Sequence, residues 1–231
     1  MAFAVTLGEM VSSCQQLGNQ PNADQLAVTE WKQHISTYYG RLHTCVADTG
    51  ARCFETTATI NLSNLALPAD HKSTIGVDFW SDAAGTHRLE LPELMVQERN
   101  VFGSQTGQAR AWWLSGTNLA LGPVPSTGTY KHIYVPQPAR YNASADTTSI
   151  DFLTSDGYEA VLWGVASVAL HRAESAQARA IDEHTKAMDA LKEWAVRRAQ
   201  TMPKRRQITN INARSWDVNG IWNPASWRYN P

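Results

Sequence analysis

Four carboxylates in the middle of the chain are the residues whose type could support acid–base catalysis. They are Asp78, Asp82, Glu90 and Glu93. Glycoside hydrolases place two carboxyl groups about 5 to 10 Å apart, one as the acid and one as the base or nucleophile. Spacing along the chain does not give that distance, and solvated strand ends carry the same residue types. Solvated strand ends are the favoured interpretation, and a carboxylate-based hydrolase acting on cell-wall sugar stays open as an alternative.

The histidines and cysteines do not form a catalytic or metal-binding motif. The sequence has no HExxH, no GxSxG and neither of the glycine-rich phosphate loops. Asp70 beside His71 has the composition of a base with its orienting group, but such a pair more often marks the end of a loop. Cys14, Cys45 and Cys53 lack CxxC spacing, which argues against a disulfide framework and a cysteine zinc site. We expect no catalytic residue, no cofactor and no metal.

Two adjacent tryptophans, Trp112 and Trp113, stand in a segment with the composition of a strand. Neighbouring residues of a strand face opposite sides of the sheet. One ring is therefore expected in the core and the other at the surface or in an interface. A surface ring could stack on a sugar or pack against another subunit, and packing against a subunit is the favoured interpretation.

The last residues, 203–231, combine aromatic and basic side chains without the period of a helix. From Arg197 to the end seven basic residues accompany one acid, Asp217, whereas the body before Arg197 has 13 basic and 20 acidic residues. A basic end on an acidic body is typical of an interaction arm. The predicted interface residues are the aromatic anchors and the basic run, namely Trp216, Trp222, Trp227, Tyr229, Lys204, Arg205 and Arg206.

The partner of this arm is not given by its composition. Basic residues next to aromatic ones could bind nucleic acid, and they could equally dock on an acidic groove of a protein. We expect an extended arm that leaves its own domain and lies on another protein chain. An arm folded back on its own helices is the alternative.

The elements that position these residues begin with two helices in residues 1–48. Thr6 and Glu9 have the spacing of a capping box, and Gly18 offers a stop for the first helix. A second, longer helix is expected from Asn22, with Gly40 as a weak point. Its apolar stripe is Leu26, Trp31, Ile35, Tyr38, Leu42 and Val46.

The composition changes at Gly50, and residues 50–140 read as short strands separated by turns. One segment, residues 92–103, is instead expected to form a short helix, because Pro92 suits a first helical position and Gly103 a stop. Helical spacing returns in residues 151–201, as two further helices. The second of these is expected to bury Ala180, Ile181, Met188, Leu191 and Trp194.

The predicted fold class is therefore α+β. Residues 1–48 and 151–201 would form an antiparallel helical bundle core, because neither helix pair can bury its own stripe alone. Residues 50–140 would be a small antiparallel β-sandwich or barrel inserted between the pairs. Residues 203–231 would be the extended arm.

The order of these parts, together with four short motifs, resembles the head-to-tail adaptor, or connector, proteins of tailed bacteriophages, especially the tail-accessory adaptors of short-tailed phages. The motifs are the turn Leu67-Pro68-Ala69-Asp70, the strand pair from Pro123 to Pro138, the helix from Tyr158 to Ala169, and Trp194 near the end of the last helix. The resemblance covers about residues 5–200. Each motif is degenerate, so their shared order carries the comparison.

The resemblance implies a structural virion protein and no enzyme. Such adaptors form a ring, usually of twelve copies, beneath the portal, where the ring extends the DNA channel and gives the tail a platform. The implied partners are copies of the chain, the portal, tail and nozzle proteins, and packaged double-stranded DNA without specific contacts. A glycan-binding or tail-decorating β module is the second interpretation.

The expected location is the neck of the virion, after synthesis in the host cytoplasm. The start of the chain has no basic region followed by an apolar run, so no signal peptide is expected. No segment approaches the roughly 20 apolar residues that span a bilayer. We therefore expect no membrane partner.

Overall fold

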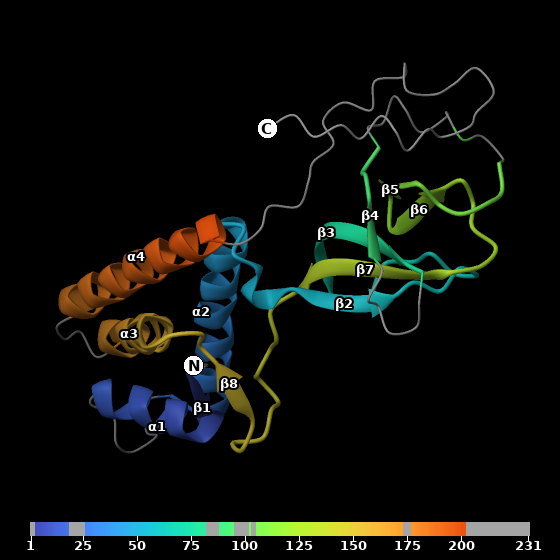
Figure 1. Ribbon diagram of the computed structural model, residues 1–231. Coiled ribbons are helices and arrows are strands. Elements are labelled where there is room, and N and C mark those ends of the chain that lie inside the picture. The colour runs from blue at the N-terminus through green and yellow to red at the C-terminus, as the bar shows by residue number, and fades with distance from the viewer. Residues whose placement is uncertain are drawn as a thin grey trace. The chain divides into compact units, whose positions relative to one another are not determined.

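The computed structural model describes residues 3–18, 26–81, 88–94, 102, 105–172 and 177–201. The chain forms two compact units (Figure 1). The helical unit contains the described residues up to 57, 68–75 and 134–201. The β unit contains the described residues of 58–67 and 76–133. Four helices together with antiparallel sheets confirm the predicted α+β class.

The helical unit is built from four helices, as the apolar spacing predicts. They are α1 (Leu7–Leu17), α2 (Val28–Asp48), α3 (Ser155–Arg172) and α4 (Gln177–Thr201). The predicted capping box at Thr6 and the stop at Gly18 are both present. Helix α2 begins at Val28, after an extended Ala27 at the N-cap, so the start expected at Asn22 is too early; Asn22 itself lies outside the described residues. The helix continues through Gly40, because burial of its apolar face outweighs the roughly 1 kcal/mol that an interior glycine costs.

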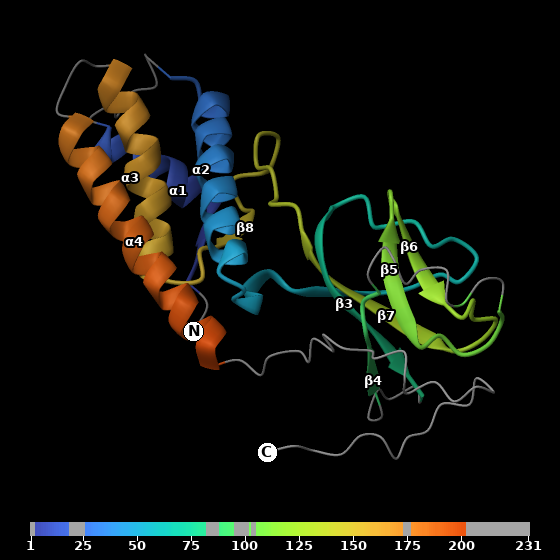
Figure 2. The ribbon, with the colours of Figure 1, turned by 90° about the horizontal axis from the view of Figure 1, so that it is seen from above.

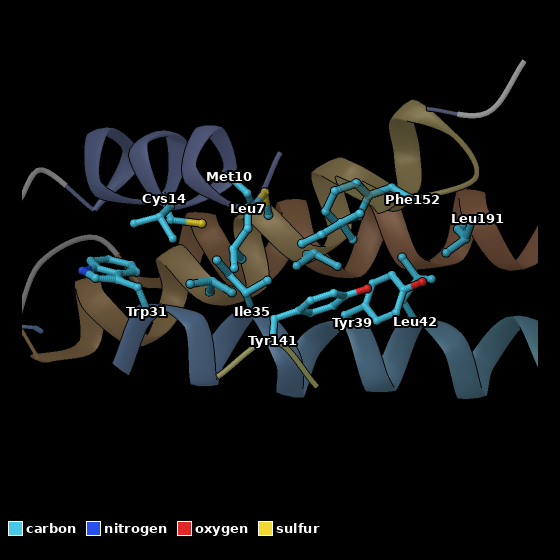
Figure 3. Close-up of a cluster of buried hydrophobic side chains, with 14 of the residues drawn as sticks. Leu7, Met10, Cys14, Trp31, Ile35, Tyr39, Leu42, Tyr141, Phe152 and Leu191 are labelled. Carbon is cyan, nitrogen blue, oxygen red and sulfur yellow. The ribbon is translucent and has the colours of Figure 1, made fainter. Parts of the chain in front are cut away.

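The core of the helical unit receives side chains from all four helices and from the segment before α3. Figure 3 shows Met10 and Cys14 of α1 facing Trp31 and Ile35 of α2. On α2 Tyr39 is a buried member of the core that the sequence pattern does not include, while the predicted Tyr38 is partly buried and packs against the core. The buried members of this core are Leu7, Met10, Val11, Cys14, Leu26, Trp31, Ile35, Tyr39, Leu42, Val46, Ala51, Tyr141, Ile150, Phe152, Val161, Val165, Ala169, Leu191 and Ala195.

Helix α3 lies at the centre of the unit and contacts each of the other three helices. Figure 2 shows α3 between α4 and α2. Small buried residues of α3, such as Ala166 and Ala169, let its neighbours approach closely. A Cβ atom added to Gly164 would lie 2.3 Å from Cδ1 of Tyr38. Tyr38 therefore packs into the space left by Gly164, and its ring meets His184 edge-on at a centroid distance of 5.3 Å.

Helix α4 packs through a set of residues that overlaps only in part with the predicted one. Its buried positions are Ala180 and Leu191, as predicted, together with Ala187 and Ala195. Trp194, also predicted, is partly buried and packs against the core. Ile181, predicted to be buried, is among the exposed apolar side chains. Close approach to α3 selects alanine over larger apolar residues, because a long side chain would keep the helix axes apart.

The β unit is organised around a four-stranded sheet and a hairpin. The sheet has the order β2-β7-β3-β4, and β5 pairs with β6. Among the described residues these sheets do not close into a barrel. The strands are β2 (Thr56–Thr59), β3 (His71–Trp80), β4 (Arg88–Leu91), β5 (Ala111–Ser115), β6 (Asn118–Gly122) and β7 (Thr129–Pro136).

Two short strands of the helical unit have no counterpart in the prediction. Strand β1 (Ala4–Thr6) pairs antiparallel with β8 (Ser149–Asp151). Three residues are too few to show an alternating pattern, so neither strand is visible in the sequence. The expected helix over residues 92–103 is wrong where the structure describes it, because Glu93 forms a β-bridge with Trp112. Residues 95–101 and 103 of that segment lie outside the described residues.

Candidate interaction surface

The predicted interface residues of the arm lie outside the described residues. They are Lys204, Arg205, Arg206, Trp216, Trp222, Trp227 and Tyr229. The extended arm over residues 203–231 therefore stays a prediction. Helix α4, from which the arm continues, is described up to Thr201.

The candidate catalytic carboxylates are only partly brought together. Asp78 and Glu90 stand directly opposite each other in the β3–β4 pair, which puts them on the same face of the sheet. Asp78 is only 3% exposed, however, so this pair is not an open glycan site. Glu93 lies in the bridge with Trp112, and Asp82 lies outside the described residues.

Asp70 and His71 each bond to a different residue. The hydroxyl of Tyr134 donates to Oδ1 of Asp70 at 3.1 Å, and Nε2 of His71 lies 2.9 Å from Oγ1 of Thr74. Burial lowers the pKa of His71, and the charge of Asp70 opposes this effect. These contacts fasten the turn before β3 to β7, which supports the structural interpretation of the pair.

The two adjacent tryptophans face different environments, as the alternation of a strand requires. Trp112 is buried in the core of the β unit, where its Nε1 donates to the carbonyl of Leu91 at 3.0 Å. Trp113 is half-buried and packs beside Phe102 and Ala111. Trp113 therefore lacks the fully open face that a sugar-stacking ring requires.

In the described part of the chain, the cysteines form no disulfide and the possible metal ligands form no metal-binding cluster. Cys14, Cys45 and Cys53 are free cysteines, and burial raises the pKa of each thiol. Among the described residues no group of three or more His, Cys, Asp or Glu side chains could hold a metal ion. A raised pKa keeps the thiols protonated at neutral pH and therefore weakly nucleophilic.

An open hollow of about 630 Å³ lies on the helical unit, beside α1 and the start of α2. We call it the α1 hollow. Its lining mixes small, apolar and acidic residues, namely Gly8, Glu9, Val11, Ser12, Ser13, Gln15, Val28 and Asp146. Val28 is 42% exposed.

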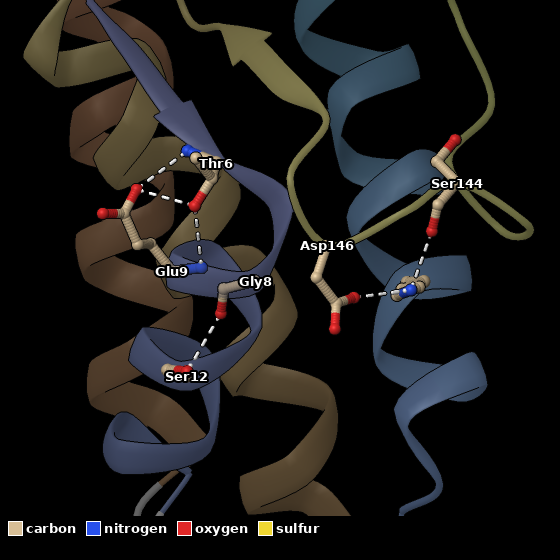
Figure 4. A network of polar contacts seen from close by, with 7 residues as sticks. Thr6, Gly8, Glu9, Ser12, Ser144 and Asp146 are labelled. Atoms are coloured by element: carbon tan, nitrogen blue, oxygen red, sulfur yellow. Dashed lines mark hydrogen bonds and ion pairs between the residues drawn. The ribbon is translucent and has the colours of Figure 1, made fainter.

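The capped N-terminus of α1 borders the α1 hollow through Gly8 and Glu9. Figure 4 shows the polar contacts of this cap. The Thr6 hydroxyl accepts from the backbone N–H of Glu9 at 3.3 Å, and the Glu9 carboxylate accepts from the backbone N–H of Thr6 at 2.9 Å. The N–H groups of Leu7 and Gly8 donate to the carbonyls of Thr148 and Asp146, at 2.8 and 2.9 Å. The first turn thus has partners for donors that a helix otherwise leaves unpaired.

The loop before β8 lies directly against this end of α1 and contributes Asp146 to the lining of the hollow, and it is also fastened to α2. Nζ of Lys32 lies 2.7 Å from Oδ1 of Asp146 and donates to the carbonyl of Ser144 at 2.8 Å. One turn further along α2, the Ser36 hydroxyl accepts from the backbone N–H of Tyr141 at 2.8 Å. The loop therefore has hydrogen bonds or ion pairs to both α1 and α2, and these contacts fix the position of Asp146.

The rim of the α1 hollow carries negative charge. Hydrogen bonds from the backbone and side chain of Thr6 lower the pKa of Glu9, so its carboxylate is ionised at neutral pH. The side chain of Asp146 is 66% exposed while it pairs with Lys32. The arrangement suits a segment that brings an aromatic or aliphatic side chain and positive charge together.

The sequence contains only part of the signal for this hollow. The capping box at Thr6 and Glu9 is recognisable in the sequence. Nothing near it in the sequence indicates that Asp146 lies beside it and also lines the hollow. Gly8 makes this meeting possible, because a Cβ atom there would lie 3.1 Å from Cβ of Asp146. A contact between segments so distant in the chain is a property of the tertiary fold.

Comparison with known proteins gives one family. A family model described as SU10 adaptor protein matches residues 6–209, which include both units. No curated protein matches the chain. Among the helices that the structure describes, none combines the length and apolar character needed to cross a membrane.

Proposed function

The chain belongs to the SU10 adaptor protein family and is a structural phage adaptor, and from this premise we propose that it forms a ring beneath the portal. The ring would contain twelve copies, as the resemblance implies, and would extend the DNA channel and give the tail its platform. The protein would lie in the neck of the virion and would catalyse no reaction.

The observation that carries this proposal is the extent of the family match. It runs from residue 6 to residue 209 and so includes all four described helices and the strands of the β unit. In the described residues, the groups that could do chemistry instead have structural contacts. Asp70 bonds to Tyr134, and Asp78 is buried.

The ring would form through contacts between neighbouring copies, in which one surface of the chain binds a different surface of the next copy. Head-to-tail contacts of this kind close into rings when the rotation between neighbours allows it. The acidic composition of the body suits a wall beside DNA, because basic residues would bind the phosphates tightly. Acidic walls would let the packaged duplex slide.

The arm would supply contacts to a neighbouring adaptor subunit or to the portal. Its anchors would be Trp216, Trp222, Trp227 and Tyr229, because buried aromatic residues dominate interface energetics at ~2 kcal/mol or more each. Arg205 and Arg206, with Lys204, would steer the arm toward an acidic surface and increase the association rate.

Co-assembly with the portal tests the ring. The purified chain and the portal would be mixed and analysed by native mass spectrometry and particle imaging, and a ring of adaptor subunits on the portal is the expected result. Absence of any stable joint assembly would contradict the proposal. A monomer whose melting temperature rises with cell-wall sugar would instead support a glycan-binding module.

Deletion of residues 208–231 tests the arm. We expect the shortened monomer to melt almost unchanged, while assembly with the portal fails. A large loss of monomer stability with normal assembly would show an arm folded back on its own helices. The full-length chain is the control in both measurements.

A further inference from the structure

We infer that the α1 hollow is the receptor for the arm of a second copy of this chain. The inference rests on the proposed ring and specifies one of its contacts. The occupant is residues 203–231 of the neighbouring subunit, with one of the indoles of Trp216, Trp222 or Trp227 in the hollow.

The shape of the α1 hollow suits an indole anchor. Small side chains, those of Gly8, Ser12 and Ser13, leave the space open, and Val11 and Val28 give it apolar walls. The hollow is open rather than enclosed, and its volume of about 630 Å³ leaves room for an indole ring. The arm carries three indole rings in 29 residues, and it has too little regular pattern to form a core of its own.

The charges of the two partners are complementary. The hollow presents the carboxylates of Glu9 and Asp146 at its rim. From residue 202 onward the arm has five basic residues and one acid. Four of the basic residues precede the aromatic segment, and Arg228 lies within it beside Trp227, so an indole in the hollow keeps positive charge near the rim. This pairing favours the arm over an acidic or uncharged peptide.

The hollow and the end of α4 lie on different surfaces of the helical unit. The hollow includes Val28, the first residue of α2. The last turn of α4 lies near the other end of α2, since the charge of Arg198 acts on Cys53, five residues after α2 ends at Asp48. A helix of 21 residues is roughly 30 Å long. Helix α4 therefore ends near one end of α2, and the hollow lies at the other. A head-to-tail contact joins two different surfaces of the same chain, and these two ends provide such a pair.

Site-specific photocrosslinking in the assembled ring tests the inference. A photoreactive phenylalanine analogue would replace Ser12 in the full-length chain, and the matched control would carry it at Ala190, which is exposed on α4. Rings would be assembled on the portal from a mixture of isotopically light and heavy chains. We expect crosslinks from position 12 to peptides within residues 203–231, joining light to heavy chains, and none from position 190.

The other outcomes overturn the inference in distinguishable ways. Crosslinks confined to single chains would show that the arm returns to its own hollow, and crosslinks to the portal would show a different occupant. If rings form without a crosslink to residues 203–231, the inference is wrong while the proposed ring stands. If no ring forms on the portal, the proposed function and the inference both fail.

A blocking substitution gives a second readout. Ser12→Trp would place an indole in the hollow and exclude the arm, so we expect the concentration needed for ring assembly to rise roughly tenfold or more. Ala190→Trp, on the exposed side of α4, is the control and should assemble normally. Unchanged assembly of Ser12→Trp, with a monomer that melts as the wild type does, would contradict the inference.

Discussion

Lowering the pH from 7 to 5 should destabilise the helical unit through one buried imidazole, that of His43. The side chain is 2% exposed, and its ring stacks on Phe54 at a centroid distance of 4.1 Å. Its Nδ1 is buried without a hydrogen-bond partner in the described structure. Burial, with a smaller contribution from the charge of Lys72, lowers the pKa of His43 to about 4.

The direction of the effect follows from the two protonation states. In the unfolded chain His43 titrates near its ordinary value of 6.5, so between pH 6.5 and about 4 the unfolded state binds a proton that the folded state does not. Stability is therefore greatest above pH 6.5 and falls as the pH decreases toward 4. The gap between the two pKa values corresponds to roughly 3 kcal/mol, of which about 2 kcal/mol is lost by pH 5.

Urea unfolding at pH 7, 6 and 5 measures this loss. His43→Phe keeps a ring against Phe54 and removes the titrating nitrogen, so its free energy of unfolding should fall by about 2 kcal/mol less than that of the wild type over this range. His171→Gln, exposed at the end of α3, is the matched control and should follow the wild type. If His43→Phe shows the same pH dependence as the wild type, the account of His43 is wrong.

Four further substitutions test the packing of the helical unit by urea unfolding. Gly164→Ala should lower the free energy of unfolding by about 1 to 3 kcal/mol, because the new methyl would lie 2.3 Å from Tyr38. Gly40→Ala, where no such contact exists, should raise it by up to about 1 kcal/mol. Equal effects of the two substitutions would contradict the contact between Gly164 and Tyr38. Thr6→Ala should cost about 1 kcal/mol through loss of the helix cap, and an unchanged midpoint would argue against that cap. Leu191→Ala should cost about 2 to 5 kcal/mol by leaving a cavity in the core, and a cost below 1 kcal/mol would show that the site collapses.

The elements that the sequence predicted well are those with strong local signals. The capping box of Thr6 and Glu9 defines where α1 begins, and the stop at Gly18 defines where it ends. Strands β3 and β7 are long enough for their composition and bounding turns to be recognised. In each case the residues that determine the element are neighbours in the chain.

The parts that the sequence did not predict depend on contacts between distant segments. Both Tyr38 and Tyr39 pack in the core, because Gly164 on another helix leaves space for Tyr38 beside the buried Tyr39. The bridge between Glu93 and Trp112 keeps the segment after Pro92 extended, although the helical signals at Pro92 and Gly103 are present. The α1 hollow likewise requires Asp146 beside Gly8, which neither local sequence indicates.

The fastening of α1 to the loop before β8 also bears on how the chain folds as it leaves the ribosome. The first two backbone donors of α1 bond to carbonyls of Asp146 and Thr148, and β1 pairs with β8. When α1 and α2 emerge during synthesis, these partners do not yet exist, and α3 and α4 are still to be made. The β unit, whose residues are all complete before β8, can fold in the interval. The apolar faces of α1 and α2 therefore stay partly exposed until α3 and α4 have been translated and can pack against them.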